Sequence, residues 1–373
     1  MAILLVITAI LALIHLYHLS DKMKRLDYVY LMVLLIVMGL NTDNADYAAY
    51  ERIYQKVSYA TTWEEIMRAH TDKGYVFLNW LATVIGMDYK CFHLGLFTLL
   101  LGGIFIIAKR IGTPICALFL AYTMYPMFMD AIQIRNFIIS AVLLFSIYCY
   151  AHANVRWYAI GVISLTIAVT IHPFILIFIP FIVFYKMYDT ERFRPITYIP
   201  ICLGLLSIAI KILIDTYWNE VTAMLTVLAD WASRGHSYIG HQVLTSRQFK
   251  IYLVVVIFAW LLYKAKKYLS TSECVNDIQK KFVELSFVAF LYLICWMPLF
   301  ALDINLATRM PRDLFLVAYM SLGIYLSKCT SQRIKIGLLF GIMFLAFFFG
   351  LVDLYISTDR FNVDVILSHN LLL

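Results

Sequence analysis

The chain has 373 residues, of which 63% are hydrophobic and 14% are charged, and its formal net charge is +7 at pH 7. A soluble globule of this composition would expose far too much apolar surface, so the composition excludes a soluble globular protein. It predicts an all-α polytopic membrane protein. No long polar, proline-rich or low-complexity segment separates the hydrophobic stretches, which indicates a single transmembrane domain over residues 1–373.

Hydrophobic stretches of suitable length recur along the whole chain. A helix needs about 20 residues to cross about 30 Å of hydrocarbon, and somewhat fewer where the bilayer thins. On this basis the sequence predicts about 12 transmembrane helices, at residues 2–19, 27–41, 91–108, 113–128, 133–151, 156–171, 173–188, 196–214, 249–268, 282–301, 312–327 and 333–352. The segment 74–87 is short and contains Tyr75, Asn79 and Trp80, so it is a thirteenth span or an interfacial or re-entrant helix.

The basic residues decide between these topologies. If 74–87 does not cross, the Lys and Arg clusters within 22–25, 109–110, 186–194, 264–281 and 328–335 all fall on one side, which is then the cytoplasm. If it did cross, the first cluster would lie on the opposite side of the membrane from all the others. We therefore expect 74–87 to stay at the outer interface, with both termini outside. The positive charge then sets topology, and no nucleic-acid partner is needed to explain it.

Two larger loops, at about 42–90 and 215–248, then lie on the outer side. Within the first, two pieces have helical character, and Thr62 with Glu65 three residues later forms a capping-box pattern. Within the second, NEVTAMLTVLADWASR reads as an amphipathic helix that ends near Gly235. Interfacial helices are thus expected in the outer loops.

Several chemistry-bearing side chains gather on this outer side. They are Asp43, Asp46, Tyr47, Tyr50, Asp130, Arg135, His172, Arg234, His236, His241, Arg247, Asp303, Arg309 and Arg312. A charge at membrane depth costs at least a few kcal/mol, so it usually faces a bundle interior or a wet cavity. Arg135 could simply snorkel to the headgroups or pair with Asp130. However, topology does not require positive charge on this side, so the outer guanidiniums favour an anionic ligand held by their planar forks.

Other polar residues leave two interpretations open. His172, just before Pro173, is either a satisfied packing residue or a site residue that exchanges a proton or hydrogen-bonds a diphosphate. Asp43 and Asp46 could hold a cation, although a solvated or helix-capping pair is the simpler interpretation. The outer tyrosines either belong to aromatic belts or stack on sugar faces. The sequence contains no Walker A loop, GxGxxG, HExxH or zinc-ligand spacing, so no metal site and no cofactor are expected.

Five motifs occur in the order known from one family. They are NTDNADYAAY after the second predicted helix, KGYVFLNWL in the first outer loop, IQIRNFIISAVLLF at the fifth helix, IHPF at an outer turn and LATRMPRDLF near the end. This ordered set resembles the EpsG-like proteins, which are polytopic bacterial membrane proteins of exopolysaccharide and O-antigen assembly related to Wzy polymerases. The residues that match the family pattern are Asp43, Tyr47, Gly74, Tyr75, Leu78, Asn79, Arg135 and His172, with a late arginine. Asn136 departs from the pattern, because glutamine commonly follows the arginine.

The resemblance implies a glycosyltransferase-type polymerase that joins oligosaccharide repeat units carried on undecaprenyl diphosphate. It would be a multi-pass protein of the bacterial cytoplasmic membrane, with its active site facing the periplasm or cell exterior. Donor and acceptor would both be lipid-linked glycans within the bilayer, and a chain-length regulator protein is a further candidate partner. Arg135 and Arg309 are assigned to the diphosphate, with Arg234 and Arg312 as second choices, and Asp43 or His172 as the catalytic base. The remaining candidates for substrate binding are Tyr47, Tyr75, Asn136 and His236.

Three other functions use related features. A glycan ligase would use the same chemistry, and a lipid-linked-sugar glycosyltransferase would be favoured if Asp43 and Asp46 bound a cation. A flippase or polysaccharide transporter would show polar residues at mid-depth in several helices and often internal repeats. In this sequence the polar residues gather at the outer mouth and no repeat is detected, which favours an enzyme.

Overall fold

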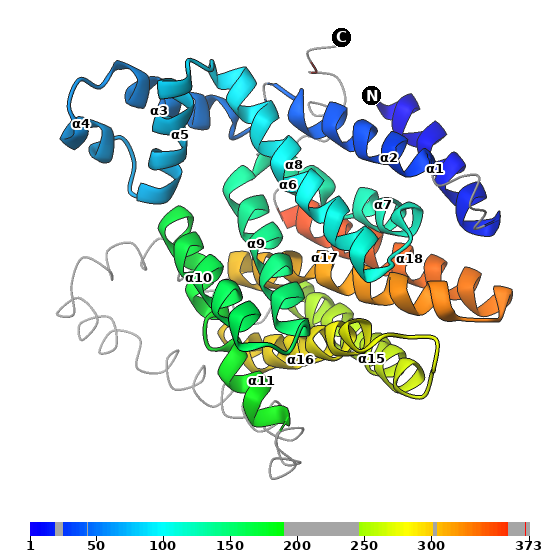
Figure 1. Ribbon diagram of the computed structural model, residues 1–373. Coiled ribbons are helices and arrows are strands. Elements are labelled where there is room, and N and C mark those ends of the chain that lie inside the picture. Colours follow the sequence, from blue (N-terminus) through cyan, green and yellow to red (C-terminus); the bar gives the residue numbers. More distant parts are fainter. Residues whose placement is uncertain (19–24, 43, 190–245, 301–303, 357–369, 371–373) are drawn as a thin grey trace.

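The computed structural model describes residues 1–18, 25–42, 44–189, 246–300, 304–356 and 370, and helices dominate this part of the chain (Figure 1). It contains no strand within these ranges, only an isolated bridge between Asn41 and Asn370. The helices are α1 (Ala2–His18), α2 (Leu26–Leu34) continued by the π-helical η2 (Leu35–Gly39), α3 (Tyr47–Tyr59), α4 (Trp63–Arg68), α5 (Lys73–Ile85), α6 (Tyr89–Ile111), α7 (Ile115–Met124), α8 (Met127–Ile132), α9 (Ile134–Ala151), α10 (Val155–Ile171), the 3-10 helix η3 (Pro173–Phe178), α11 (Phe181–Asp189), α15 (Ser246–Ser270), α16 (Asp277–Phe300), α17 (Ile304–Lys328) and α18 (Gln332–Ile356).

Three of the described helices are long and apolar enough to cross a membrane, at Tyr89–Ile111, Ile134–Ala151 and Gln332–Asp353. Shorter apolar helices occupy most of the other predicted spans, so the all-α class is confirmed, whereas the number of twelve spans is not established. The predicted span 196–214 and the amphipathic helix predicted within 215–248 lie outside the described residues.

Two predicted spans are not single α-helices. The prediction of one helix over 113–128 is wrong, because α7 ends at Met124 and the short α8 begins after Pro126. Tyr125 before this proline is extended, with φ −173° and ψ 140°, as expected for a residue that precedes proline. The predicted span 173–188 begins with the 3-10 turns of η3, and α11 starts only after Pro180. Proline removes an N–H donor and disfavours helix at the residue before it, which local hydrophobicity does not reveal.

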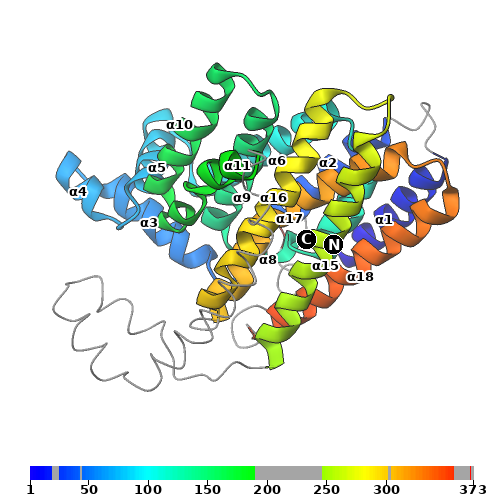
Figure 2. The same cartoon turned by 90° about the horizontal axis from the view of Figure 1, so that it is seen from below.

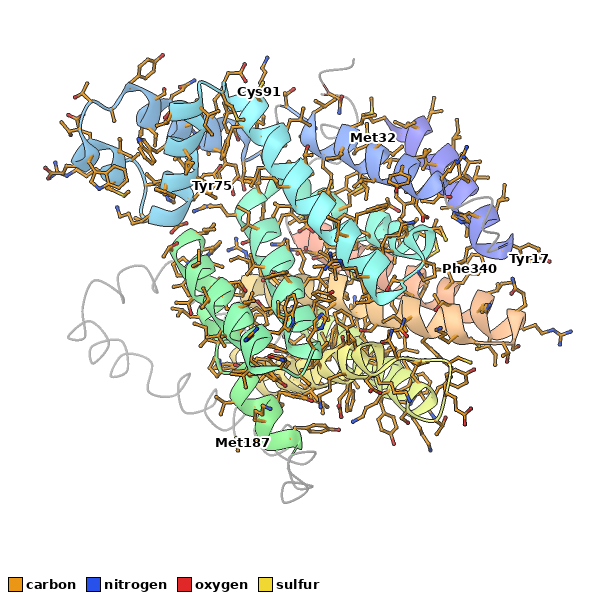
Figure 3. The ribbon with its side chains drawn as sticks, in the orientation of Figure 1. Tyr17, Met32, Tyr75, Cys91, Met187 and Phe340 are labelled. Carbon is orange, nitrogen blue, oxygen red and sulfur yellow. The ribbon has the colours of Figure 1, made fainter. Side chains whose placement is uncertain are left out.

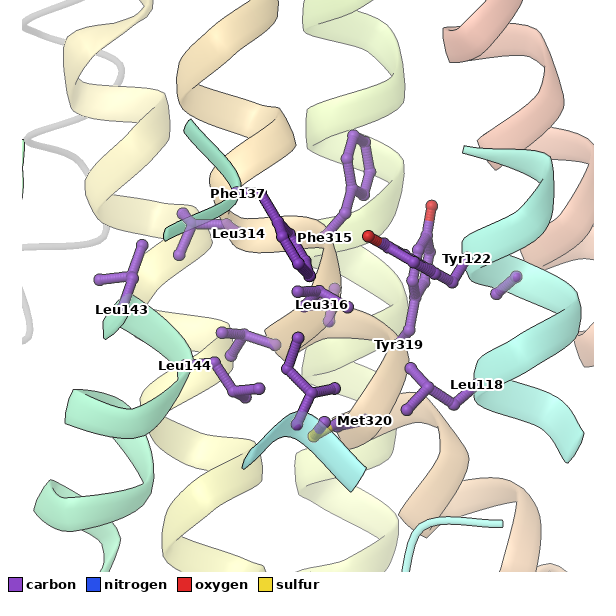
Figure 4. Close-up of a cluster of buried hydrophobic side chains, with 14 of the residues drawn as sticks. Leu118, Tyr122, Phe137, Leu143, Leu144, Leu314, Phe315, Leu316, Tyr319 and Met320 are labelled. Carbon is purple, nitrogen blue, oxygen red and sulfur yellow. The ribbon is translucent and has the colours of Figure 1, made fainter. Parts of the chain in front are cut away.

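The core of the helical bundle lies between α7, α9 and α17 (Figure 4). α17 is buried all round its middle, which is typical of a central helix. The labelled side chains in this cluster are buried and come from these three helices: Leu118, Tyr122, Phe137, Leu143, Leu144, Leu314, Phe315, Leu316, Tyr319 and Met320. Peripheral helices instead expose apolar side chains, such as Tyr17 of α1, Met32 of α2 and Phe340 of α18 (Figure 3). Such an apolar exterior is what a lipid-embedded bundle requires.

The basic helix ends lie together at one end of the bundle. Lys328, at the end of α17, donates from Nζ to the Cys274 carbonyl between α15 and α16, at 2.9 Å. Gln279, near the start of α16, donates to the Ile111 carbonyl at the end of α6, at 2.7 Å. The Lys and Arg clusters within 109–110, 264–281 and 328–335 therefore share one end, as the topology argument expects.

Helices α3, α4 and α5 form a separate lobe beside the start of α6, which we call the α3–α5 lobe (Figures 1 and 2). The predicted capping box at its second helix is confirmed, since the Thr62 side chain accepts from the Glu65 N–H and the Glu65 carboxylate accepts from the Thr62 N–H. The lobe is thus built from short helices with their own local start signals.

Gly74 allows the lobe to dock on the end of α10. A Cβ at this position would overlap the Thr170 hydroxyl and would lie 2.8 Å from the Thr170 carbonyl carbon. Side-chain movement can relieve the first overlap but not the second, because the second involves backbone. The glycine of the KGYVFLNWL motif is therefore explained by the close approach of two helices rather than by a turn.

Replacing Gly74 by alanine should destabilise the docking of the lobe by about 1–3 kcal/mol, the usual cost of overpacking. Activity should fall with it, because α5 begins beside the candidate site described below. Gly102→Ala is a matched control, since nothing lies within 4 Å of a Cβ built there. Thermal unfolding in one detergent measures both variants. If Gly74→Ala unfolds at the temperature of Gly102→Ala, the close-packing explanation is wrong.

Candidate active site

Arg135 is the second residue of α9 and lies where that helix meets the α3–α5 lobe. Gln133, with φ −99° and ψ 68°, interrupts the preceding helix and sets the start of α9. The guanidinium forms an ion pair through Nη1 with the Asp72 carboxylate, and its Cζ lies 5.4 Å from the centre of the Tyr50 ring. The Arg135 side chain remains 23% exposed, whereas that of Asp72 is 10% exposed. The site therefore already binds an anionic group at a partly open guanidinium.

Asp130 does not take part in this ion pair. Its Oδ2 accepts a hydrogen bond from the Tyr122 hydroxyl at 2.9 Å, and the residue is fully buried. The alternative interpretation, in which Arg135 pairs with Asp130, is therefore wrong. Burial raises the pKa of the Asp130 carboxyl to about 7, and the nearby Arg312 guanidinium opposes that rise.

Asp72 precedes α5 and directs its carboxylate away from the helix N–H groups. No side-chain cap is formed, and Oδ2 instead faces Arg135. The Asp72 N–H donates to Nδ1 of His70 at 3.0 Å, and the same Nδ1 lies 3.8 Å from Oδ2. Burial, followed by the positive charge of Arg135, lowers the pKa of His70. The lobe thus supplies Arg135 with one carboxylate, and the His70 imidazole lies beside that carboxylate.

Two tyrosines predicted to bind substrate, Tyr47 and Tyr75, lie inside the lobe. Tyr75, on α5 (Figure 3), is fully buried, and its ring meets that of Tyr50 edge-on, with ring centres 5.6 Å apart. Tyr47 is also buried, with its ring 5.0 Å from Tyr89 and 5.5 Å from His93. In this conformation the rings of Tyr47 and Tyr75 are packed against other aromatic rings, and their predicted contact with substrate stays a prediction. Tyr75 thereby supports the Tyr50 ring that lies against Arg135.

His172 lies between α10 and η3, and its Nδ1 caps η3 by accepting the Phe174 N–H at 3.3 Å. Burial, followed by the positive charge of Arg135, lowers the pKa of His172 to about 4, while Asp72 acts in the opposite direction. The imidazole is therefore neutral at physiological pH. Because Nδ1 is the acceptor, the proton resides on Nε2, which makes this atom a hydrogen-bond donor. Between the two predicted roles, donation to an anion fits this arrangement better than proton abstraction.

The structure also brings Arg309 into this neighbourhood. Arg135, Asp72, Arg309 and Arg312 are the charges that act on the His172 imidazole. Arg309 is half-buried on α17. Three residues that are far apart in sequence, Arg135, His172 and Arg309, thus lie in one charged region at the end of the bundle opposite the basic loops.

The side chains of Arg312 and Asn136 are buried, unlike the half-buried side chain of Arg309. Arg312 has a side-chain exposure of 1% and donates from Nη2 to Oε1 of Gln133 at 2.6 Å, while its Nη1 lies 3.9 Å from Oδ2 of Asp353. Asn136 is buried and donates to the same Gln133 oxygen, also at 2.6 Å. In this conformation both side chains hold the start of α9 in place, and their predicted roles in substrate binding stay predictions. Gln133 is the shared acceptor.

Some predicted site residues cannot be placed. Asp43, Arg234 and His236 lie outside the described residues. Within the described ranges, no group of three or more His, Cys, Asp and Glu side chains is arranged to hold a metal ion. Conversely, Asp72 and Gln133 were not among the site residues predicted from the sequence. The only local signal for either residue is its position: Asp72 comes two residues before Gly74, and Gln133 comes two residues before Arg135.

A family model described as the EpsG family matches residues 24–364. The chain belongs to the EpsG family. The matched range contains every residue of the candidate site, and the resemblance drawn from the five motifs is confirmed. EpsG-family membership together with the apolar helices indicates a membrane protein of polysaccharide biosynthesis. Neither the curated proteins nor the solved structures include a match to this EpsG-family chain.

Proposed function

We propose that this EpsG-family protein is a polymerase that joins oligosaccharide repeat units carried on undecaprenyl diphosphate. The observation that carries the proposal is the ion pair between Arg135 and Asp72 at a partly exposed helix start. A guanidinium that holds a carboxylate in this setting also suits a phosphate oxygen, since the planar fork matches both groups. Arg309 adds a second positive charge to the same region.

In this reaction a sugar hydroxyl of the acceptor attacks the anomeric carbon of the donor glycan. The new glycosidic bond forms as the bond to the diphosphate oxygen breaks, and negative charge develops on the departing lipid diphosphate. Arg135 stabilises that charge, and Arg309 and the Nε2–H of His172 assist. The hydroxyl proton needs a base within hydrogen-bond reach. Asp43 remains the candidate for this role, because Nδ1 of His172 is engaged with Phe174.

The proposed orientation follows from the two ends of the bundle. The end that collects the basic loops faces the cytoplasm, and the end with Arg135 faces the periplasm or cell exterior of the bacterial cytoplasmic membrane. Twelve spans and two outer termini belong to the same proposal. Donor and acceptor glycans then reach the site from the outer leaflet, where a chain-length regulator protein would also act.

Analysis of lipid-linked glycans after deletion of the protein tests this function. Loss of a polymerase should leave single repeat units on the lipid, on the outer face, and the full-length chain should restore long glycans. A ligase would leave long chains on the lipid, and a flippase would leave single units that glycosidases added outside the membrane cannot reach. Either of these two results would overturn the proposal.

Two replacements of His172 separate its role as the cap of η3 from its role as a hydrogen-bond donor through Nε2. His172→Asn places an amide oxygen near Nδ1 and can retain the bond from the Phe174 N–H, whereas His172→Gln places its amide near Nε2. We expect Asn to keep stability but to lower activity by about 1.5–3 kcal/mol, roughly 10- to 150-fold, the cost of a hydrogen bond to a charged group. Gln should retain more activity at lower stability. Glycan length distributions and thermal unfolding measure the two effects, and full activity of His172→Asn would exclude the donor role.

The pH dependence of the wild-type protein checks the same assignment. The pKa of His172 falls from 6.5 to about 4 on folding, so the unfolded chain binds more protons between these values. This contribution to stability is fully present above pH 6.5 and is lost as the pH falls towards 4. The difference in unfolding temperature between pH 7 and about pH 5 should therefore shrink in His172→Asn. An unchanged difference would mean that His172 is not buried as a neutral group.

A further inference from the structure

The outward face of α5 carries a stripe of apolar side chains. Phe77 is 41% exposed, Leu81 36%, Val84 64% and Ile85 64%. Their spacing of four, three and one residues places them on one side of a helix. The opposite side is buried in the lobe through Tyr75, Val76, Asn79 and Ala82. An apolar helix face as exposed as this one is usually covered by lipid or by another protein surface.

The surroundings of the stripe indicate lipid as the occupant. α10, which packs against the start of α5 at Thr170, exposes an apolar face of its own at Val162, Ile163 and Ile167. α6, which begins four residues after α5 ends and is long enough to span a membrane, exposes Leu99 and Ile106. The stripe therefore lies on a helix whose two neighbours, α6 and α10, both carry apolar surfaces that a bilayer must cover.

Tryptophans mark the depth at which α5 would lie. Trp80 on α5 packs edge-on against Trp63 of α4, with ring centres 5.4 Å apart, and Trp63 is 52% exposed. Phe77 packs beside the same Trp80 ring at 5.4 Å. Tryptophan concentrates at the headgroup level of membranes, where one part of its ring is apolar and the N–H is hydrated. The pair therefore favours the interface over the hydrocarbon centre.

The length and contacts of α5 argue against a crossing helix. Its 13 residues extend about 20 Å, short of the roughly 30 Å of hydrocarbon that a span must cross. One long side is occupied by the lobe, and the residue before the helix, Asp72, is fixed to Arg135. A helix held in this way can offer the bilayer only its outward stripe.

We propose that α5 lies in the headgroup region of the outer leaflet, with Phe77, Leu81, Val84 and Ile85 inserted among the lipid chains. Because Asp72 connects the start of α5 to Arg135, this contact also holds the Arg135 guanidinium at headgroup depth. That depth is where the diphosphate of a membrane-embedded polyprenyl substrate lies. The choice of the outer leaflet and this second step rest on the proposed function, whereas the lipid contact does not.

Depth-dependent fluorescence quenching tests the lipid contact without any assay of activity. An environment-sensitive fluorophore is attached to a single cysteine at position 84, or at position 55 as a control, in full-length protein whose seven native cysteines are replaced. Gln55 is exposed on α3, within the same lobe. The protein is reconstituted in vesicles of phosphatidylethanolamine and phosphatidylglycerol. These vesicles carry lipids brominated either near the headgroup or near the chain end, and iodide serves as the aqueous quencher.

We expect the label at position 84 to be quenched most by bromines near the headgroup and to be shielded from iodide, in contrast to position 55. Iodide access equal to that at position 55 would mean that no lipid covers the stripe. Strongest quenching by chain-end bromines would mean that α5 inserts deeply. Protection from both iodide and bromine would indicate a protein partner or a second copy of the chain. Each of these three results would overturn the proposal.

Activity then tests the link to Arg135. Val84→Asp should reduce quenching by the headgroup bromines, measured at a label on position 81, and should raise the KM for a lipid-linked donor at least several-fold. Val84→Leu keeps the apolar contact and should change neither quantity. If Val84→Asp detaches the helix but leaves KM unchanged, the link to Arg135 fails although the lipid contact stands. If the unmodified protein makes no polymer at all, the proposed function fails, and the quenching result is unaffected.

Discussion

Replacing Arg135 by lysine should leave insertion and folding intact but reduce polymerisation by about 2–4 kcal/mol in transition-state stabilisation, roughly 30- to 1,000-fold. Lysine keeps the charge and can still form an ion pair with Asp72. It lacks the planar fork that binds two phosphate oxygens at once. The effect should therefore appear in catalysis rather than in stability. The measurement is the length distribution of lipid-linked glycans in cells with matched membrane levels of each variant.

Two carboxylate variants serve as controls for Arg135→Lys. Asp72→Asn removes the anionic partner of the guanidinium but leaves its fork intact, so polymerisation should fall less than in Arg135→Lys. Asp130→Asn should also be milder, because Asp130 accepts from Tyr122 and does not contact Arg135. If Arg135 only ties the lobe to α9, Arg135→Lys would make near-wild-type chains. Asp72→Asn would then be as harmful as removal of the arginine, and the diphosphate assignment would be abandoned.

Replacing Arg312 by methionine should destabilise the protein by about 3–5 kcal/mol, the usual cost of breaking a buried ion pair by removal of one partner. The guanidinium lies beside Asp353 and donates to Gln133, so its loss affects α17, α18 and the start of α9 together. Methionine fills a similar volume but supplies neither charge nor donor. Thermal unfolding in one detergent, followed by the fraction of protein that remains monodisperse, measures the change.

Two further variants show whether the cost comes from the buried charge. Arg333→Met removes an arginine from an exposed position at the start of α18 and should leave the unfolding temperature unchanged. Asp353→Asn combined with Arg312→Met should recover part of the stability, because it removes the carboxylate left beside the missing guanidinium. If Arg312→Met is as stable as Arg333→Met, the buried contacts of Arg312 with Asp353 and Gln133 do not stabilise the fold. A direct role for it at the substrate would then have to be considered again.

Much of the fold could be read from local patterns. The hydrophobic stretches mark most of the helices, and Thr62 with Glu65 marks the start of α4. The failures occur where a single residue overrides the pattern. Pro126 and the extended Tyr125 break an apolar run that hydrophobicity alone predicts as one helix, and Pro173 and Pro180 do the same before α11. The first of these breaks matters for the site, because it separates α8 from α7, and Gln133 at the end of α8 then sets the start of α9.

The candidate site was predicted unevenly. Arg135 and His172 were found because a charge or an imidazole in an apolar stretch is costly and thus conspicuous. Asp72 was not found, because an aspartate in a polar loop has no such signal. Tyr47 and Tyr75 were predicted to bind substrate without any indication of their burial, because an aromatic residue in a loop looks the same in sequence whether its ring is buried or exposed.

The sequence by itself determined the helical membrane class, the end of the bundle that collects positive charge and the arginine at a helix entrance, because these properties depend on composition and on neighbours within a few turns. Only the tertiary structure decided which groups meet. Asp72 reaches Arg135 across 63 positions of sequence. Arg309 and Arg312 are three residues apart, yet one side chain is half-buried and the other is enclosed beside Asp353. Such differences arise from how the helices pack, since packing alone determines which face of a helix is desolvated and which partner lies within hydrogen-bond distance.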